Sequence, residues 1–211
     1  MLYSEIKIIK KITKKKIRGV IHVGAHNGSC INTYARMGIK NIILFEPNSD
    51  LVEKIKKKIS IFKILNFKIK LENIALGNYN GITTFNINSN DQCSSILNLG
   101  LHKEIYKDAV VLKKKKVLIK TLDTFNKREY FNGINFLNID AQGFELNVLK
   151  GLKNILNQID LIYCEINFDY LYKKNALAHQ IDSYLEKFNF KRVYTVTPYH
   201  PTWGDAIYVK K

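Results

Sequence analysis

The feature that most constrains this chain is a glycine-containing loop that follows a short apolar run. Residues 20–23, Val-Ile-His-Val, lead directly into Gly24-Ala25-His26-Asn27-Gly28. A second apolar run begins at Asn41 and ends on Glu46, 18 positions after Gly28. A strand, a glycine turn, a helix and a second strand tipped with a carboxylate form the layout by which α/β proteins hold an adenosine. The layout predicts a nucleoside-type ligand at these two strand ends.

One position of the loop favours a particular ligand. A dinucleotide loop needs Gly at its second motif position so that the backbone can approach a pyrophosphate, but His26 occupies that place. S-adenosylmethionine has a ribose and an adenine but no pyrophosphate, so it needs only a close backbone at Gly24 and a hydroxyl acceptor at Glu46. We therefore favour S-adenosylmethionine over NAD. The alternative interpretation is an ordinary strand-to-helix turn followed by a solvated carboxylate.

Length and composition set the outer limits. With 211 residues and 46% hydrophobic content, the chain can bury one substantial core, and we expect a single domain with a basic helix over 1–17 and a Rossmann-like core over 18–211. No apolar run is long enough for a membrane span, and the first 20 residues are basic rather than signal-like. Cys30, Cys93 and Cys164 are scattered, which argues against a disulfide framework and a zinc site. A cytoplasmic location is expected, and no oligomeric state is predicted.

The formal net charge of +16 raises the question of nucleic-acid binding. All but four of the 34 basic residues are Lys, and the Lys runs at 14–16, 56–58 and 113–116 are dispersed and not interleaved with aromatics. Readers of phosphates and bases usually exploit the bidentate fork of Arg. A generic solvated surface is therefore the favoured interpretation, with nucleic acid as the less favoured one.

Apolar periodicity and turn residues predict alternating helices and strands. Helices are expected at residues 2–16, 27–37, from 49 into the 50s or 60s, 145–156 and 176–188. Strands are expected at 18–23, 41–46, 67–74, 117–122, 134–140, 159–165, 192–197 and 206–210. Alternation favours a parallel sheet, and a final strand pair without an intervening helix favours an antiparallel last strand. The predicted fold class is α/β: a Rossmann-like, seven-stranded, mostly parallel sheet of the class I methyltransferase arrangement.

Three further segments are expected around the sheet. Residues 78–90 alternate around Gly81, which suggests an antiparallel hairpin added to the edge. Residues 88–115 are the least regular, polar at first and Lys-rich at the end, and predict a lid or a substrate loop. Residues 198–205 are expected to form the turn before the last strand.

Short segments in a fixed order carry a resemblance to a known family: His22-Val-Gly-Ala-His-Asn-Gly28, Phe45-Glu46-Pro47-Asn48, Asn73-Ile-Ala-Leu-Gly77, Ser94-Ser95-Ile96, Thr121-Leu-Asp-Thr-Phe125, Asn138-Ile-Asp-Ala-Gln-Gly-Phe-Glu145 and Trp203-Gly-Asp-Ala206. Together they resemble the FkbM-type S-adenosylmethionine-dependent O-methyltransferases over nearly the whole chain beyond the first helix. The ordered combination is much more specific than any one segment.

The resemblance implies a cofactor site. The glycine loop and Glu46 would hold S-adenosylmethionine, with Ala75 and Leu76 beside its adenine and Asp140 at the ligand-facing end of the fourth strand. The residues expected to bind the cofactor are His22, Gly24, Ala25, His26, Asn27, Gly28, Glu46, Pro47, Asn48, Ala75, Leu76 and Asp140. Many members carry an acid where this chain has His22 and Glu where it has Gln142. The role of the first acid must therefore pass to Asp140, to a backbone carbonyl or to His22 itself.

The chemistry of methyl transfer predicts where catalytic residues lie. The sulfonium methyl is already electrophilic, so the protein must align a hydroxyl, exclude water and remove a proton. Such residues should gather at the carboxyl edge of the sheet. The catalytic candidates are Asp140, His200 as a base, and Glu165; the substrate-binding candidates are Ser95, Gln142, Trp203 and Asp205.

Each candidate also has a plainer interpretation. Asp140 could cap the following helix through the amides of Gln142 and Gly143. Glu165 could brace a loop, His200 could be solvent exposed, and Trp203 could plug the turn. His102 and His179 are expected to be ordinary surface residues.

Cofactors, acceptor and rival functions complete the expectations. Asp140, Glu165, His200 and Asp205 could together hold Mg or Mn, but nothing in their spacing requires a metal. The resemblance implies a hydroxyl acceptor on a sugar, a glycan or a lipid-linked or secondary metabolite. The alternatives are 2′-O-methylation of RNA and a binding module that keeps the cofactor fold without turnover.

Overall fold

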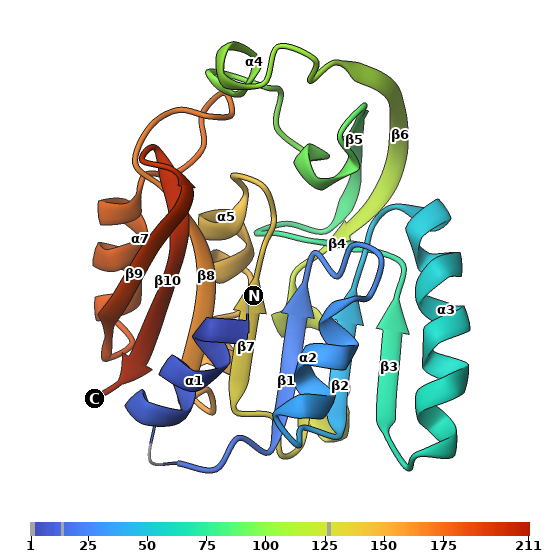
Figure 1. Ribbon diagram of the computed structural model, residues 1–211, viewed down its shortest axis with the longest axis vertical. Helices are drawn as coiled ribbons and strands as arrows, with labels where there is room; N and C mark the ends of the chain where they lie inside the picture. Colours follow the sequence, from blue (N-terminus) through green and yellow to red (C-terminus); the bar gives the residue numbers. More distant parts are fainter. Residues whose placement is uncertain (1–2, 14, 126–127) are drawn as a thin grey trace.

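The computed structural model describes residues 3–13, 15–125 and 128–211, and its centre is a seven-stranded sheet (Figure 1). The strands lie in the order β3-β2-β1-β7-β8-β10-β9. They span Gly19–Val23 (β1), Asn41–Phe45 (β2), Lys68–Glu72 (β3), Phe136–Ile139 (β7), Leu161–Asn167 (β8), Phe190–His200 (β9) and Trp203–Lys210 (β10). The first five in this order are parallel, and β10 runs antiparallel to both β8 and β9. The predicted fold class, with its antiparallel last strand, is confirmed.

Helices cover both faces of this sheet. One face packs against α1 (Tyr3–Ile12), α2 (Cys30–Arg36) and α3 (Ser49–Ile64) through a core that includes Ile9, Tyr34 and Ile55. The other face packs against α5 (Glu145–Lys150), α6 (Lys153–Leu156) and α7 (Ala178–Glu186) through a core that includes Leu149 and Ile181. The central strands β1 and β7 are buried along their whole length. This is why they read as continuous apolar runs without alternation.

The first of the expected helices is shorter than predicted, and the helix expected over 145–156 is interrupted. The latter is divided into α5 and α6, with Gly151 as the C-cap of α5. Only glycine fits at this position, because a side chain there would lie 1.9 Å from the carbonyl oxygen of Gly77. The helix expected over 2–16 ends at Ile12, and positions 2 and 14 of that expectation lie outside the described residues. None of the described helices combines the length and the apolar character that crossing a bilayer requires.

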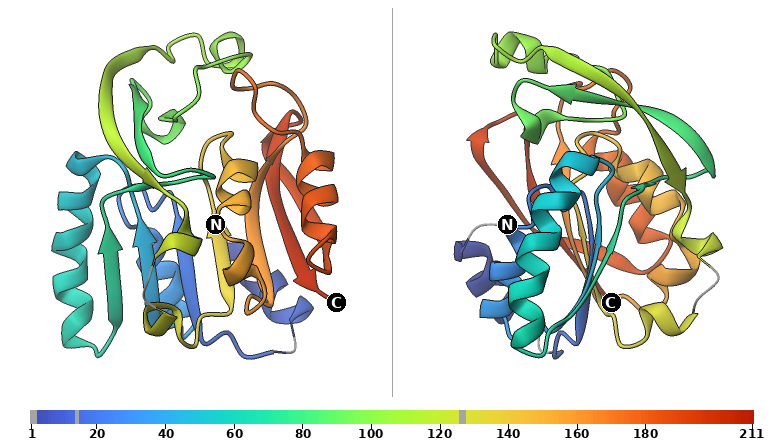
Figure 2. Two further views of the ribbon diagram at one scale, coloured as in Figure 1. Left: turned by 180° about the vertical axis from the view of Figure 1, so that it is seen from behind. Right: turned by 90° about the vertical axis from the view of Figure 1, so that its right-hand side faces the viewer.

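A second, three-stranded sheet arches over the carboxyl ends of the central strands (Figure 2). It contains β4 (Ala75–Leu76), β6 (Val111–Lys120) and β5 (Gly81–Asn88), in that order. The hairpin expected within 78–90 is wrong, because β5 is a single strand that pairs antiparallel with β6, about thirty residues further along the chain. The Lys run 113–116 therefore lies in a strand and not in a loop.

The segment expected as an irregular lid is more ordered than predicted. It contains a 3₁₀ turn, η1 (Asp91–Cys93), and the short helix α4 (His102–Ile105) before β6 begins. A small separate core of Leu99, Ala109, Leu171 and Tyr172 fixes it. The backbone amide of Gly100 also donates to the carbonyl of Leu171 at 2.7 Å. Similarly, the turn expected over 198–205 is almost entirely hairpin, since β9 continues to His200 and β10 begins at Trp203.

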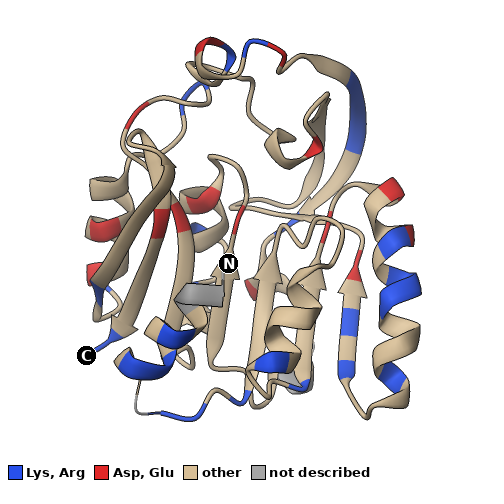
Figure 3. Ribbon diagram, in the orientation of Figure 1, with Lys and Arg blue, Asp and Glu red and all other residues tan. Residues whose placement is uncertain are grey.

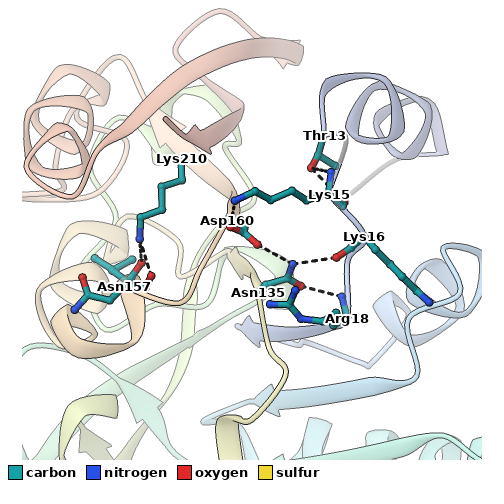
Figure 4. Close-up of polar contacts among 9 residues, drawn as sticks. Thr13, Lys15, Lys16, Arg18, Asn135, Asn157, Asp160 and Lys210 are labelled. Carbon is teal, nitrogen blue, oxygen red and sulfur yellow. Dashed lines mark hydrogen bonds and ion pairs between the residues drawn. The ribbon is translucent and has the colours of Figure 1, made fainter.

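Short 3₁₀ turns also follow β6, at Leu122–Thr124 (η2) and Arg128–Phe131 (η3). At the opposite, amino-terminal edge of the large sheet, one buried amide holds the link between α1 and β1 in place (Figure 4). The side chain of Asn135 accepts the amide of Arg18 at 2.8 Å and donates to the carbonyl of Lys16 and to Asp160. Asp160 also pairs with Lys15 at 2.7 Å.

We expect Asn135→Ala to lower the free energy of unfolding by about 1–3 kcal/mol, because Asn135 is 1% exposed and its loss leaves buried polar partners unsatisfied. Asn157→Ala at the same corner is the matched control, since Asn157 is exposed and offers its carbonyl to Lys210. Urea unfolding of the two variants measures the difference. Equal stability of both variants would contradict the role given to Asn135.

Candidate active site

A cavity of about 530 Å³ opens at the carboxyl edge of the large sheet, within the size range of small-molecule and cofactor sites. It lies between the strand ends, α2, the η1 segment and the start of β10. The structure brings to it most of the residues singled out from the sequence: His22, Gly24, Ala25, His26, Glu46, Pro47, Ala75, Leu76, Asp140, Gln142, Glu165, Trp203 and Asp205. Five other candidates do not line it: Asn27, Gly28, Asn48, Ser95 and His200.

Glu46 is the best-defined polar group of the cavity. It follows β2, is 4% exposed, and its two carboxylate oxygens accept the backbone amides of His26 and Asn48, each at 2.8 Å. These bonds fix the carboxylate while leaving further lone pairs on both oxygens. Burial raises the pKa of Glu46 to about 7, against the opposing effect of the two amides. The arrangement suits a pair of hydroxyl donors, because hydroxyls that donate to the carboxylate stabilise its charged form.

The pKa of Glu46 predicts a pH-dependent affinity for a nucleoside with a free ribose diol. Below pH 7 the carboxyl is protonated in the free protein and loses acceptor capacity; above pH 7 it is charged and ready to bind. Affinity for S-adenosylhomocysteine should therefore rise from pH 5.5 to 7 by up to tenfold per unit and level off above about pH 8. Calorimetric titration across this range measures the profile, and Glu46→Gln should flatten it. A profile in the wild type as flat as that of the variant would contradict this assignment.

Gly24 allows two neighbouring strands to close the floor of the cavity. Its φ is +82°, and a side chain there would lie 1.8 Å from the carbonyl oxygen of Asp140. The amides of Gly24 and Ala25 both donate to the carbonyl of Phe45, at 3.0 and 3.1 Å. The loop after β1 therefore lies against the ends of both β2 and β7. The close approach of its backbone to a ligand, which the sequence suggests, stays a prediction.

Three of the candidates outside the cavity, Asn27, Gly28 and Asn48, shape the backbone around it. The Asn27 side chain accepts the amide of Ser29 and so closes the loop. A side chain on Gly28, at φ +74°, would meet Ile55 of α3 at 3.1 Å. Asn48 caps α3 through the amide of Asp50, and its own amide is one of the two that hold Glu46. Because the loop occupies residues 24–29, α2 begins at Cys30 and not at residue 27.

The carboxylate of Asp140 does not cap the following helix, which was the simpler interpretation of this residue. Glu145 binds the backbone amides of that turn in its place. Oε1 of the fully buried Glu145 accepts the amides of Ala141 and Gly143, both at 3.0 Å. Asp140 instead accepts a bond from the side-chain amide of Gln142 at 2.6 Å. Its carboxylate is thus held at the cavity wall by a side chain and open to a ligand.

Gln142 joins two of the three catalytic candidates. Its Nε2 donates to both Asp140 and Glu165, the latter at 2.8 Å, while the hydroxyl of Tyr172 donates to its Oε1 at 2.6 Å. Tyr172 therefore fixes the orientation of the amide. Burial raises the pKa of Glu165 well above its usual range, and nearby carboxylates add to the effect. Asp205 lies opposite Glu165 in the β8–β10 register, on the same cavity wall.

Ser95 and His200 lie outside the cavity wall. Ser95 is 1% exposed, and its hydroxyl donates to the carbonyl of Gln142 at 2.7 Å, so it supports the loop that carries Gln142. The ring of His200 contacts the hydroxyl of Thr202 at 2.7 Å within the β9–β10 hairpin. In contrast, Trp203 lines the cavity and stacks on Tyr199, with the ring centroids 5.5 Å apart.

The sequence missed a histidine that does line the cavity. His102, expected at the surface, is 5% exposed and packs against the rings of Tyr106 and Tyr172. Its Nδ1 has no hydrogen-bond partner among the described residues, and burial lowers its pKa. Phe85 of β5 and Asp91 of η1 also line the cavity, and Asp91 pairs with the ring of His26 at 3.0 Å. No local signal reveals these positions, because they depend on a segment folding back over the sheet.

The cavity has the opposite charge to the rest of the molecule. Its acidic residues are Glu46, Asp91, Asp140, Glu165 and Asp205, and within the described chain no Lys or Arg lines it. Figure 3 shows Lys and Arg on α1, α3 and β6, with Asp and Glu at the ends of the central strands. Over residues 3–13, 15–125 and 128–211, no three His, Cys, Asp or Glu side chains gather as metal ligands do. The four residues that could have held Mg or Mn, Asp140, Glu165, His200 and Asp205, do not form such a group, and His200 does not line the cavity.

Solved structures share this fold at low sequence identity. Methyltransferase FkbM from Methylobacillus flagellatus KT superposes with a TM-score of 0.66 and 12% identity over 99% of this chain and 48% of that one. The chain thus spans about half the length of that protein. Magnesium protoporphyrin IX methyltransferase from Synechocystis PCC 6803, with bound S-adenosylmethionine, has a TM-score of 0.55 and 9% identity, over 99% and 77% of the two chains. TrmK of M. capricolum, bound to S-adenosylhomocysteine, gives 0.52 and 14%, over 100% and 69%.

These structural similarities establish only the fold, whereas a match to a sequence family establishes the family. No curated protein sequence matches the chain. Residues 22–192 match the Methyltransferase FkbM domain, from the end of β1 to the start of β9. The match includes the glycine loop, Glu46, Asp140 and Glu165, and it covers well over half of the sequence. The chain therefore belongs to the methyltransferase FkbM family.

Proposed function

We propose that this protein is an S-adenosylmethionine-dependent O-methyltransferase that methylates a hydroxyl of a sugar, a glycan or a related metabolite. The observation that carries the proposal is Glu46: a buried carboxylate, fixed by two backbone amides, at the wall of a cavity that also holds Asp140. A carboxylate that can hold a nucleoside diol, next to a second carboxylate that can receive a proton, suits methyl transfer from such a cofactor to a hydroxyl.

The described residues fit the cofactor. Glu46 would accept the ribose hydroxyls, while Ala75, Leu76 and Phe85 offer an apolar wall for an adenine. When bound, S-adenosylmethionine supplies a methyl group on a sulfonium, which needs no further activation. The protein's own task is to exclude water, align the acceptor and receive its proton.

Asp140 is the proposed proton acceptor. Its carboxylate is oriented by Gln142 and open to the cavity, whereas the raised pKa of Glu165 favours the protonated acid at neutral pH. Glu165 would then hold the acceptor hydroxyl, with Trp203 and Asp205 beside it. The role expected for His200 stays a prediction, and the imidazoles that line the cavity are those of His22, His26 and His102.

The charge of the cavity supports a neutral acceptor over RNA. Even with Glu165 protonated, a lining that holds Glu46, Asp140 and other acidic residues, and no described Lys or Arg, would repel a phosphate backbone close to the reacting centre. The Lys run of β6 lies on the outer sheet, where RNA could bind without placing a ribose in the cavity. The stacked rings of Tyr199 and Trp203 suit the apolar face of a sugar.

Two measurements test the proposed function. S-adenosylhomocysteine at 100 times its dissociation constant should raise the free energy of unfolding by about 2.7 kcal/mol. With S-adenosylmethionine present, mass spectrometry of products should show methylation of neutral saccharides, and phosphorylated versions of the same saccharides should react at least tenfold more slowly. Methylation of ribose in capped RNA alone would favour the RNA alternative. Tight cofactor binding without any product across a broad acceptor panel would favour the binding module.

A further inference from the structure

A buried chain of three side chains runs from the middle of the large sheet to the cavity. Asn138 of β7 donates through Nδ2 to the hydroxyl of Tyr34 at 2.8 Å, and this hydroxyl lies 2.9 Å from Nδ1 of His22. Asn138 is 2%, Tyr34 0% and His22 7% exposed. His22 and Tyr34 both line the cavity, on the side of α2.

Counting hydrogens fixes the state of the imidazole. The Tyr34 hydroxyl accepts a hydrogen bond from Asn138, and among the described residues Nδ1 of His22 is the only acceptor within reach of its own hydrogen. Because Tyr34 is fully buried, we take the hydroxyl to donate to Nδ1. Burial raises the pKa of Tyr34 well above its usual range, which keeps that hydrogen in place. Burial also lowers the pKa of His22 to about 3, so the ring is neutral at physiological pH. A neutral ring that accepts at Nδ1 must carry its hydrogen on Nε2.

This end of the cavity is lined by donors that can meet an anion. Besides His22, the residues that line it from α2 and the turn before it include Ser29 and Thr33, whose hydroxyls can donate, and no acidic residue lies in the first turn of α2. Asp140 directly follows β7, the strand that pairs with β1, and His22 lies opposite Asn138 in that pairing. A zwitterion bound in the cavity across the ends of these two strands would therefore find a donor at His22 and a carboxylate at Asp140.

We propose that Nε2–H of His22 binds the carboxylate of the amino-acid end of S-adenosylmethionine, with its ammonium turned toward Asp140. The proposal rests on the proposed function and names a residue that selects among adenosine ligands. Many members of the family carry an acidic residue at the position of His22. A charged carboxylate can only accept hydrogen bonds, whereas Nε2–H of His22 donates one. In this chain, the part of the cavity beside residue 22 therefore offers a hydrogen-bond donor to the ligand in place of an acceptor.

Binding of three ligands tests the proposal. S-adenosylhomocysteine carries the complete amino acid, a decarboxylated analogue keeps only the ammonium, and 5′-methylthioadenosine lacks both. In the wild type, loss of the carboxylate should weaken binding at least tenfold. In His22→Ala, the affinity for S-adenosylhomocysteine should fall by the same factor, while the affinities for the decarboxylated analogue and for 5′-methylthioadenosine stay unchanged. His22→Asp should reverse the preference and favour the decarboxylated analogue.

The outcomes separate this proposal from the proposed function. If 5′-methylthioadenosine does not bind the wild type, the nucleoside site itself is refuted. If it binds but His22→Ala weakens all three ligands equally, His22 is only structural and the proposal fails. Unchanged affinity of 5′-methylthioadenosine in each variant also shows that the fold is retained.

The tautomer can be measured without any ligand. The imidazole ¹⁵N shifts of His22 should show a protonated Nε2 and an unprotonated Nδ1 that do not change between pH 5 and 8. In Tyr34→Phe, which removes the donor to Nδ1, the two tautomers should exchange. A wild-type ring with its hydrogen on Nδ1, or one that titrates near pH 6.5, would overturn the proposal.

Discussion

Glu46→Ala should weaken binding of S-adenosylhomocysteine by about 100-fold or more, because two ribose hydroxyls lose a charged acceptor. The substitution also releases the amides of His26 and Asn48, which the carboxylate holds at 2.8 Å each. The loop that forms the floor of the cavity then loses a fixed position. Isothermal titration calorimetry at pH 8, where the wild-type carboxylate is charged, gives the largest difference.

Glu72 provides a matched control for this variant. It ends β3, the strand next to β2, and lies opposite Phe45 in the register, so it is a carboxylate at the same edge of the same sheet. Its partner is the hydroxyl of Tyr130, and it does not line the cavity. Glu72→Ala should leave the affinity unchanged. Comparable losses in both variants would mean that general charge, and not a diol site at Glu46, attracts the ligand.

Gly24→Ala should have the second-largest effect, lowering the free energy of unfolding by roughly 3–5 kcal/mol and removing cofactor binding. The new side chain would lie 1.8 Å from the carbonyl oxygen of Asp140, so the ends of β1 and β7 must separate. Gly38→Ala isolates the contribution of the backbone conformation. Gly38 has a similar φ, +76° against +82°, but a side chain there meets nothing within 4 Å.

The difference between the two glycine variants measures the close approach itself. Gly38→Ala should cost only about 1–2 kcal/mol, the usual penalty for a left-handed residue, and should bind S-adenosylhomocysteine normally. Thermal unfolding with and without ligand gives both quantities. If Gly24→Ala were no more harmful than Gly38→Ala, the floor of the cavity would be looser than the structure indicates.

The sequence predicted the central sheet well because its strands are buried on both faces. Apolar runs such as 20–23 and 159–165 have few competing interpretations, and the glycine loop marks the strand end that faces a ligand. Glu46 and Asp140 could be found for the same reason: each is the first polar residue after a buried strand. Thirteen of the predicted site residues line the cavity, since parallel strands end at one edge.

The parts that the sequence did not predict depend on contacts between distant segments. The strand β5 pairs with β6, and no local feature of either strand predicts this pairing. His102 is buried only because its segment packs on Leu171 and Tyr172, nearly seventy residues away. Likewise, the close approach of Gly151, at the end of α5, to the carbonyl of Gly77 joins segments more than seventy residues apart. The pattern of apolar residues within a segment does not identify the distant segment that it contacts.

The central claim is that Glu46 holds the ribose of a nucleoside cofactor in this cavity, and the unmodified protein can test it directly. The measurement is the dissociation constant of S-adenosylhomocysteine against that of its 2′,3′-dideoxy analogue at pH 8. We predict that removal of the two hydroxyls weakens binding by about 100-fold, and that Glu46→Ala binds both ligands equally poorly. Equal affinity of the wild type for the two ligands would contradict the account.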